Sequence, residues 1–167
     1  MPKIFITVGT HTQQFNRIVE KMDELAGAGK INGSTVFAQT GNCTYAPKNF
    51  KFKKFMDAKE YERAIKASSI VVSHGGAGSI INSLKNRKVL IITPRLQRYG
   101  EHTNDHQREL ANALEKRGKA IALHDVSKLG GAIKKAGSFK IRGKEEKEGL
   151  IMALEEFWQS EVAGAGK

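Results

Sequence analysis

A glycine-rich segment in the middle of the chain has the composition of a phosphate-binding loop. Its residues are His74, Gly75, Gly76, Ala77, Gly78 and Ser79. Glycine leaves no side chain between backbone N–H groups and an oxyanion, and a helix starting here would add a positive N-terminal end. The segment lacks the Gly-Lys-Ser/Thr ending of a P-loop, and it lies too late in the chain for the dinucleotide-binding fingerprint of a first strand. We predict a phosphate cradle, although close packing of a helix on a strand would also select glycine.

Two polar loops earlier in the chain could contact the same ligand. The first contains Gly9, Thr10 and His11, and the second contains Gln39, Gly41 and Asn42. Backbone N–H groups of the first loop could receive an anion, because this loop opens a predicted helix. In the second loop the glycine can adopt a positive φ, and the asparagine can hydrogen bond to the edge of a ligand. Each loop on its own is also compatible with an ordinary turn.

A long polar loop at residues 94–107 precedes another predicted helix. Loops with so many hydrogen-bonding side chains usually recognise a ligand. The candidate binding residues here are Glu101, Asp105, His106 and Gln107. Glu101, Asp105 and His106, together with His102, could suggest a metal site. They lie on a loop and a helix start rather than on one helical face, so we predict none. No Gly-x-Ser-x-Gly elbow supports a Ser/His/Asp triad, and the residues identify no catalytic group.

The apolar residues around these loops alternate between strand and helix periods. Strands are predicted at residues 3–8, 34–39, 48–55, 69–73, 88–92 and 120–123. Helices are predicted at residues 15–28, 79–86, 105–116, 126–136 and 144–159. One more begins after Asp57 as its N-cap, with Glu60 three residues later as in a capping box and with Tyr61 on its apolar face. Strands and helices at this spacing form right-handed βαβ units. We predict a Rossmann-like three-layer α/β domain with a parallel sheet, whose ligands bind beyond the carboxyl ends of the strands.

The chain is strongly basic. Its 28 Lys and Arg against 17 Asp and Glu give a net charge of +11 over 167 residues. Such a surplus favours nucleic acid, an anionic membrane face or phosphate-bearing substrates as partners, or is a solvated surface only. Residues 48–55 alternate aromatic and basic side chains, with Phe50 and Phe52 on one face. This segment could stack bases, but we favour a half-buried strand with solvated lysines.

Other features point to a cytoplasmic protein. Cys43 is the single cysteine, so no intrachain disulfide can form. The longest apolar runs fall far short of the roughly 20 residues of a membrane-spanning helix. The N-terminal residues lack the pattern of a secretory signal. We expect residues 161–167 to be a disordered tail.

Four motifs resemble the small, stand-alone glycosyltransferase family 28 C-terminal-domain proteins, which include Alg13-like and bacterial PssE/EpsF-like subunits. The motifs lie at residues 8–17, 39–42, 73–79 and 94–107. The resemblance covers nearly all of residues 3–137 and extends to the C-terminal half of MurG. It implies that residues 1–160 form one half of a GT-B glycosyltransferase.

The resemblance also implies an activity. The chain would be the donor-binding subunit of a two-component inverting enzyme, with a UDP-sugar of the UDP-GlcNAc or UDP-glucuronate type as donor. A hexose-type sugar would pass to a lipid-linked pyrophosphate acceptor during polysaccharide or glycan assembly. A membrane-attached partner of the Alg14/PssD type would bind the acceptor, so the chain would be inactive alone and would reach the cytoplasmic membrane face through that partner. No metal or cofactor is needed. The alternative is a non-catalytic Rossmann module that binds a nucleotide or RNA, with nucleic acid the less favoured ligand.

Roles for single residues follow from the same resemblance. It places the diphosphate against the Gly9–Thr10 turn and the glycine-rich segment, and the uracil at Phe55 and Met56. The residues implied to read the sugar hydroxyls are Asp105, His106 and Gln107. At Asn82 this chain departs from the family, which usually has Glu there to accept both ribose hydroxyls. Asn offers one neutral acceptor, which leaves the ribose contact open.

The last predicted helix carries an apolar stripe. Its residues are Leu150, Ile151, Leu154, Phe157 and Trp158. They recur at helical spacing on an otherwise charged segment. We expect the partner subunit or a second copy of the chain to cover this stripe, with packing on the domain's own sheet as the alternative.

Overall fold

The computed structural model describes residues 3–142 together with Gly149, Met152, Leu154 and Gln159. Within these residues the chain forms one six-stranded, fully parallel sheet with the order β3-β2-β1-β4-β5-β6. The strands are β1 (Ile4–Thr7), β2 (Val36–Gln39), β3 (Lys51–Lys53), β4 (Ile70–Ser73), β5 (Val89–Ile92) and β6 (Ile121–Ala122). All six were predicted from the sequence, and the parallel α/β class is confirmed.

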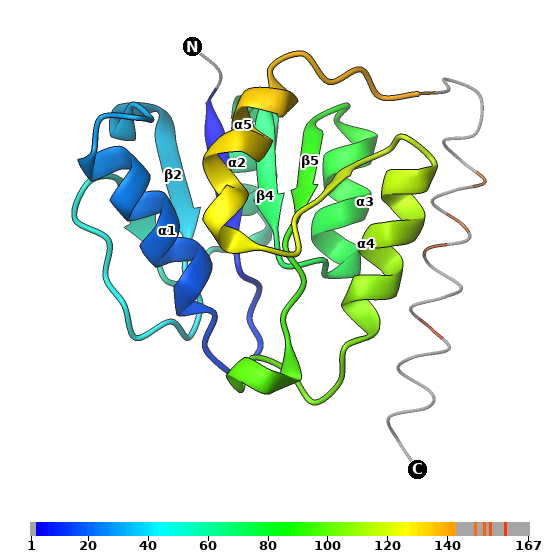
Figure 1. Ribbon diagram of the computed structural model, residues 1–167, viewed down its shortest axis with the longest axis horizontal. Coiled ribbons are helices and arrows are strands. Elements are labelled where there is room, and N and C mark those ends of the chain that lie inside the picture. Colours follow the sequence, from blue (N-terminus) through cyan, green and yellow to red (C-terminus); the bar gives the residue numbers. More distant parts are fainter. Residues whose placement is uncertain (1–2, 143–148, 150–151, 153, 155–158, 160–167) are drawn as a thin grey trace.

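Helices cover both faces of the sheet. On one face lie α1 (Asn16–Gly27) and α5 (Leu129–Ala136), in front of the strands in Figure 1. On the other face lie α2 (Ala58–Ala67), α3 (Ala77–Lys85) and α4 (His106–Lys116). Short 3₁₀ turns occur at Gly33–Thr35, Gln97–Tyr99 and Val126–Lys128. The arrangement is the expected three-layer sandwich.

The central strands are apolar except at their carboxyl ends, because both of their faces are covered. In β1, Ile4 and Ile6 pack into the core beneath α1 and α5, while Phe5 packs into the core beneath α2, α3 and α4. All four residues of β4 are buried as well. At the start of α2, the Asp57 carboxylate accepts from the Glu60 N–H while the Glu60 side chain accepts from the Asp57 N–H, which is the predicted capping box.

The order of the strands creates a crevice. From β1 the chain moves through α1 to β2 and β3 at one edge, and then crosses back through α2 to place β4 on the other side of β1. The connections that leave β1 and β4 therefore run to opposite faces of the sheet. Ligands of open parallel sheets bind at such a switch point, beyond the carboxyl ends of the strands.

Several predicted boundaries differ from the structure. Helix α3 begins at Ala77 rather than Ser79, so part of the glycine-rich segment is helical. The predicted helix at residues 126–136 starts with a 3₁₀ turn. The predicted strand at residues 48–55 is shortened to β3, so Phe50 precedes the strand and is buried in the core next to α1. Phe52 pairs with Ala38 of the same core, on the predicted common face, but is 37% exposed.

A single carboxylate holds this connection in place. Residues 40–50 link β2 to the parallel strand β3 without an α-helix. The Asp23 side chain on α1 accepts hydrogen bonds from the Tyr45 hydroxyl at 2.7 Å, from the Lys48 N–H at 3.0 Å and from the Asn49 N–H at 2.8 Å. Burial alone would raise the pKa of Asp23, but these hydrogen bonds outweigh it and lower the pKa below its usual value.

The anchor at Asp23 makes folding sensitive to acid. A carboxyl with a depressed pKa in the folded state stabilises the fold above its unfolded pKa and loses that contribution as the pH falls through the folded value. We expect Asp23→Asn to lower the free energy of unfolding by about 2 kcal/mol at pH 7. The deficit should shrink as the pH falls below about 4, because the Asp23 carboxyl of the unfolded wild type takes up a proton there while that of the folded protein does so only at lower pH. Urea titrations from pH 7 to pH 3 measure it, and a deficit that stays constant over this range would contradict the assignment.

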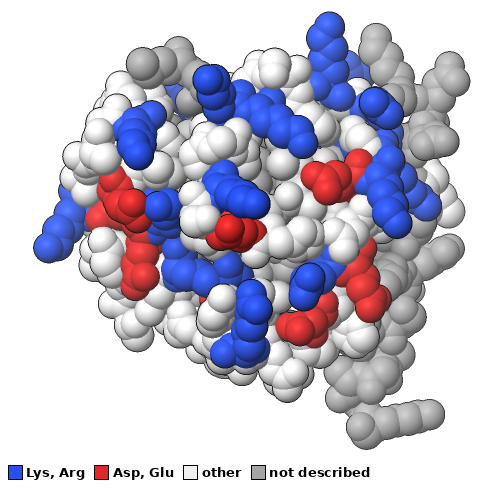
Figure 2. Space-filling model, viewed as in Figure 1, with Lys and Arg blue, Asp and Glu red and all other residues white. Residues whose placement is uncertain are grey.

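The surface carries the excess positive charge in a dispersed form. Figure 2 shows Lys and Arg spread over the α1–α5 face, with Asp and Glu between them and no single basic stripe. Several lysines are paired with acids, as Lys53 is with Glu60 at 2.6 Å. No helix among the described residues has the length and apolar character to cross a membrane.

The C-terminal apolar stripe is described at one position. Leu154 is 5% exposed and belongs to the core that contains Phe5, Leu84 and Leu114. At Leu154 the domain itself therefore covers the stripe, which corrects the expectation of an unpartnered surface there. Leu150, Ile151, Phe157 and Trp158, and the tail expected at residues 161–167, lie outside the described residues.

Candidate functional site

A cavity of about 420 Å³ lies at the carboxyl ends of the strands. It is lined by Thr7, Gly9, Thr10, His11, Gln39, Met56, Tyr61, His74, Gly76, Ala77, Gly78, Ser79, Asn82, Arg95, His102 and Gln107. These residues come from the ends of β1, β2 and β4 and the loops beside them, from α2 and α3, from the loop after β5 and from the first turn of α4. The cavity thus occupies the switch point between β1 and β4.

The glycine-rich segment forms one wall. Gly76 is the N-cap of α3 and has no side chain to cap the helix, so the first helical turn, with Ala77 and Gly78, meets the cavity directly. The Ser79 hydroxyl donates to Gly76 O at 2.7 Å and contacts the Ser73 hydroxyl, which also accepts from the Gly75 N–H. Ser79 therefore shapes the segment from within. The free N–H groups of the helix can bind an oxyanion.

The glycines on either side of His74 leave room for its ring. A Cβ at Gly9 would lie 2.6 Å from the imidazole of His74, and one at Gly76 would collide with the same ring. Gly9 also has a φ of +76°, which side chains rarely tolerate. The His74 ring therefore packs between the β1–α1 loop and the start of α3.

The side chain of Gln39 holds the turn after β1 in place. Its Oε1 accepts from the Thr7 hydroxyl at 2.8 Å and from the Gly9 N–H at 3.2 Å, while its Nε2 donates to Gly9 O at 3.0 Å and to Lys54 O at 3.1 Å. All four bonds join neighbouring strand ends. The buried amide positions the wall of the cavity at Gly9.

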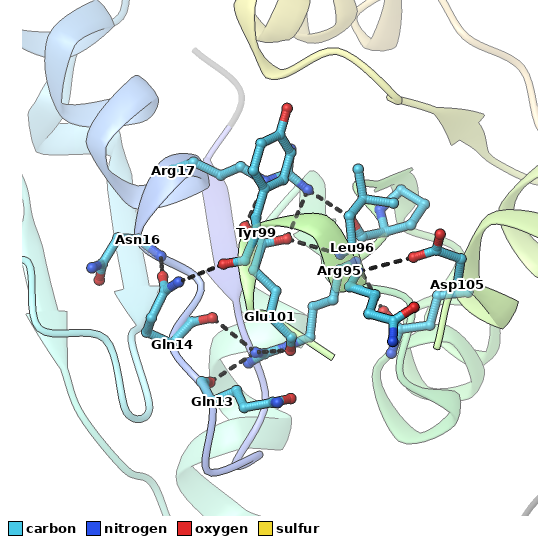
Figure 3. Close-up of polar contacts among 12 residues, drawn as sticks. Gln13, Gln14, Asn16, Arg17, Arg95, Leu96, Tyr99, Glu101 and Asp105 are labelled. Carbon is cyan, nitrogen blue, oxygen red and sulfur yellow. Dashed lines mark hydrogen bonds and ion pairs between the residues drawn. The ribbon is translucent and has the colours of Figure 1, made fainter. Parts of the chain in front are cut away.

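A buried arginine joins two of the loops. Arg95 is 1% exposed, and its guanidinium donates to Val8 O at 2.6 Å and to Gln13 O at 2.8 Å in the β1–α1 loop (Figure 3). It also donates to Glu101 O at 3.1 Å within its own loop. The Glu101 carboxylate, itself 1% exposed, pairs with Arg17 at 2.6 Å and accepts from the Leu96 N–H at 2.9 Å. The two loops are thereby held against each other.

Aromatic rings extend this contact outward. The Arg17 guanidinium lies 5.0 Å from the ring centroid of Phe15 and 5.0 Å from that of Tyr99. Arg95 lies 5.2 Å from the Phe15 ring, and Arg98 lies 4.8 Å from the Tyr99 ring. Cations and aromatic rings thus alternate from the buried Arg95 to the exposed Tyr99.

The electrostatics of the cavity favour a negatively charged ligand. No Asp or Glu lines it, while Arg95 and the N-terminus of α3 do. Burial, followed by the charge of Arg95, lowers the pKa of His74 to about 3, so this ring is neutral at pH 7. Burial and Arg95 lower the pKa of His11 as well. Among the described residues no group of three acidic, His or Cys side chains could hold a metal ion.

Most residues identified from the sequence meet in this cavity. Those that line it are Gly9, Thr10, His11, Gln39, Met56, His74, Gly76, Ala77, Gly78, Ser79, Asn82 and Gln107. Those that do not are Gly41, Asn42, Phe55, Gly75, Glu101, Asp105 and His106.

Several residues of the second group support the walls instead. Asn42 donates to His11 O at 2.9 Å, and Gly41, with a φ of +51°, makes the tight turn after β2. Asp105 accepts from the Gln97 N–H at 3.0 Å. Phe55 is 48% exposed, and His106 is exposed at the start of α4.

Four residues of the cavity were not identified as binding residues from the sequence. They are Thr7, Tyr61, Arg95 and His102. Arg95 and His102 belong to the motif at residues 94–107, and that motif could have identified them as binding residues. Tyr61 was assigned to a buried helical face, and its hydroxyl reaches the Thr7 hydroxyl at 3.4 Å.

Comparison with known proteins agrees with this architecture. The chain is 31% identical over 128 residues to the UDP-N-acetylglucosamine transferase subunit ALG13 of Mus musculus, and 31% identical over 126 residues to that of Homo sapiens. Each match covers 71% of this chain but 10% and 11% of the relative, so the chain spans about a tenth of their length.

Solved glycosyltransferases share the fold. The glycosyltransferase of kitacinnamycin matches 93% of this chain with a TM-score of 0.64 at 18% identity, and MurG of Acinetobacter baumannii matches 93% with a TM-score of 0.57 at 15% identity. This chain covers 40% and 46% of those structures, so it corresponds to one half of a GT-B fold. The model of the glycosyltransferase family 28 C-terminal domain matches residues 3–156. With that match and the relatives above, this chain belongs to the glycosyltransferase family 28 C-terminal domain family.

Proposed function

We propose that this chain is the donor-binding subunit of a two-component inverting glycosyltransferase, and that its cavity binds the diphosphate of a UDP-sugar. One observation carries the proposal: the cavity at the switch point faces the uncapped N-terminus of α3 and contains no carboxylate. Its backbone N–H groups and helix end would stabilise the charge that develops on the departing UDP. The relatives whose name includes UDP-N-acetylglucosamine support a donor of the UDP-GlcNAc type, with UDP-glucuronate as the second candidate.

The remaining groups of the donor have places in or beside the cavity. Met56 and the neighbouring, exposed Phe55 would contact the uracil. Gln107 lines the cavity and would bind sugar hydroxyls, with Asp105 and His106 next to it in the chain. On α3, Asn82 donates to Gly78 O at 2.9 Å, which leaves its side-chain oxygen as the single acceptor for a ribose hydroxyl.

A second protein would complete the enzyme. In this proposal an Alg14/PssD-like, membrane-attached subunit binds the lipid-linked pyrophosphate acceptor and supplies the general base. This chain then acts at the cytoplasmic face of the membrane through that partner. The reaction needs no metal or cofactor bound to this chain.

The isolated chain should bind its donor and transfer nothing. We expect calorimetric titration to detect UDP-N-acetylglucosamine, and radiolabelled sugar to reach a lipid-linked acceptor only when the partner subunit is added. UDP-glucuronate titrated in parallel identifies the sugar class. Efficient transfer by the purified chain alone would contradict the proposal that donor binding and acceptor binding lie on separate subunits.

An RNA-binding module is the alternative from another functional class. The observation in its favour is β3, where Lys51, Phe52 and Lys53 are all exposed. A single-stranded oligonucleotide titrated at 50 and 200 mM salt tests it, because binding through phosphates weakens steeply with salt. Tight oligonucleotide binding, with no binding of either UDP-sugar, would replace the proposed function with this one.

A further inference from the structure

Two imidazole rings meet at the cavity from separate loops. His11 lies in the β1–α1 loop and His102 in the loop after β5, and their ring centroids are 5.1 Å apart. Both residues line the cavity. Asn42 holds the backbone of His11 through a 2.9 Å hydrogen bond to its carbonyl oxygen. The buried Arg95 and Glu101 hold the two loops together, and these contacts keep the two rings next to each other.

The backbone determines which nitrogen of each ring carries the proton. Nδ1 of His11 accepts from the Gln13 N–H at 3.3 Å, and Nδ1 of His102 accepts from the Asn104 N–H at 3.2 Å. A nitrogen that accepts carries no proton, so each neutral ring is protonated at Nε2. Neither Nε2 has a hydrogen-bond partner within the described part of the chain. Both rings therefore offer a free N–H donor.

The surroundings select what these donors bind. Arg95 is a fixed positive charge near the pair, and the charge of Glu101 is taken up by Arg17. His74 is neutral, with its Nδ1 at 3.3 Å from Thr7 O. Asp105 is exposed and accepts from Gln97 N–H. Two N–H donors next to an arginine, in a cavity with no carboxylate, suit an oxyanion better than a cation or an apolar group.

We propose that His11 and His102 form a paired N–H donor site that binds an oxygen of the donor diphosphate. The inference rests on the proposed function, and it adds two binding side chains to the backbone N–H groups of α3. As the sugar leaves, negative charge grows on the diphosphate, and donors that are already in position stabilise it.

Alanine and glutamine variants test the pair. The amide nitrogen of glutamine replaces an Nε2 donor without an ionisable group. We expect His11→Ala and His102→Ala each to weaken binding of UDP-N-acetylglucosamine about tenfold or more, with unchanged binding of uridine, which has no phosphate. His11→Gln and His102→Gln should retain most of the affinity.

Controls separate this inference from the proposed function. His124→Ala changes an exposed histidine that does not line the cavity and that contacts Asn112 on α4, and it should leave the binding of all ligands unchanged. Inorganic pyrophosphate serves as a nucleotide-free probe. If it binds and depends on the pair while UDP-sugars do not bind, the donor site stands and the proposed function fails. Equal losses for uridine and UDP-N-acetylglucosamine, unchanged affinity in the alanine variants, or no binding of pyrophosphate and UDP-sugar alike would overturn the donor site.

Discussion

Gly78→Val is expected to abolish donor binding in a protein that still folds. Gly78 lies in the first turn of α3 and lines the cavity, and a Cβ built there meets no atom within 4 Å. The valine side chain would therefore enter the space of the diphosphate without disturbing the protein. Loss of several hydrogen bonds to a charged group should weaken UDP-N-acetylglucosamine about a hundredfold or more in calorimetric titration.

Gly131→Val is the matched control for this change. Gly131 is also a helical glycine with open space around it, but it lies on α5 and does not line the cavity. Both variants should melt at or slightly above the wild-type temperature, because valine has a higher helix propensity than glycine. Gly76→Val is less informative, since its side chain would displace His74. A Gly78→Val protein that binds the donor normally would show that the diphosphate does not approach this turn of α3.

Glu101→Gln should have the largest effect on stability. The change leaves the Arg17 guanidinium without its carboxylate and the buried Arg95 without a nearby negative charge. It also replaces one acceptor by a donor, so the Leu96 N–H or Arg17 loses its partner. Removing one member of a buried ion pair costs about 3 kcal/mol. We expect a deficit of this size in urea unfolding, together with weaker donor binding, because the loop carries His102.

The control for Glu101 is an exposed pair on the same helix as Arg17. Glu24, whose side chain is 66% exposed, pairs with Lys21 at 2.9 Å. Glu24→Gln removes the same charge, and exposed pairs contribute at most about 1 kcal/mol. If both glutamine variants lose equal stability, the effect is one of net charge, and Glu101 has no special role.

The fold could be predicted from the sequence because short local patterns of residues determine its strands and helices. Apolar runs such as β1 and β4 are buried on both faces, and the capping box at Asp57 marks the start of α2 from two residues alone. The exceptions came where distant groups intervene. Phe50 lies in the core before β3, next to a loop that Asp23 on α1 holds through the Asn49 N–H. The spacing of apolar residues around Phe50 does not indicate this contact with α1.

The cavity could be predicted from the sequence where glycines form its wall. Glycines between a strand end and a helix start indicate that a ligand can come close to the backbone. This pattern identified the segment that contains Gly76 and Gly78. Side chains that act across the fold gave no such signal. Arg95 reaches carbonyl groups more than 80 positions away, and the donor role of His102 depends on a ring from the first loop. Glu101, chosen as a binding residue, is instead buried in an ion pair.

The anchor at Arg95 leaves the side chains of the first loop free to change. Its guanidinium holds that loop through the carbonyl oxygens of Val8, Gln13 and Gln14, which every amino acid possesses. Thr10 lines the cavity, so its replacement would alter the cavity wall without removing a bond that shapes the loop. A changed ligand preference would then need only a point mutation at little cost in stability. Libraries at this position are the place to begin altering what the cavity binds.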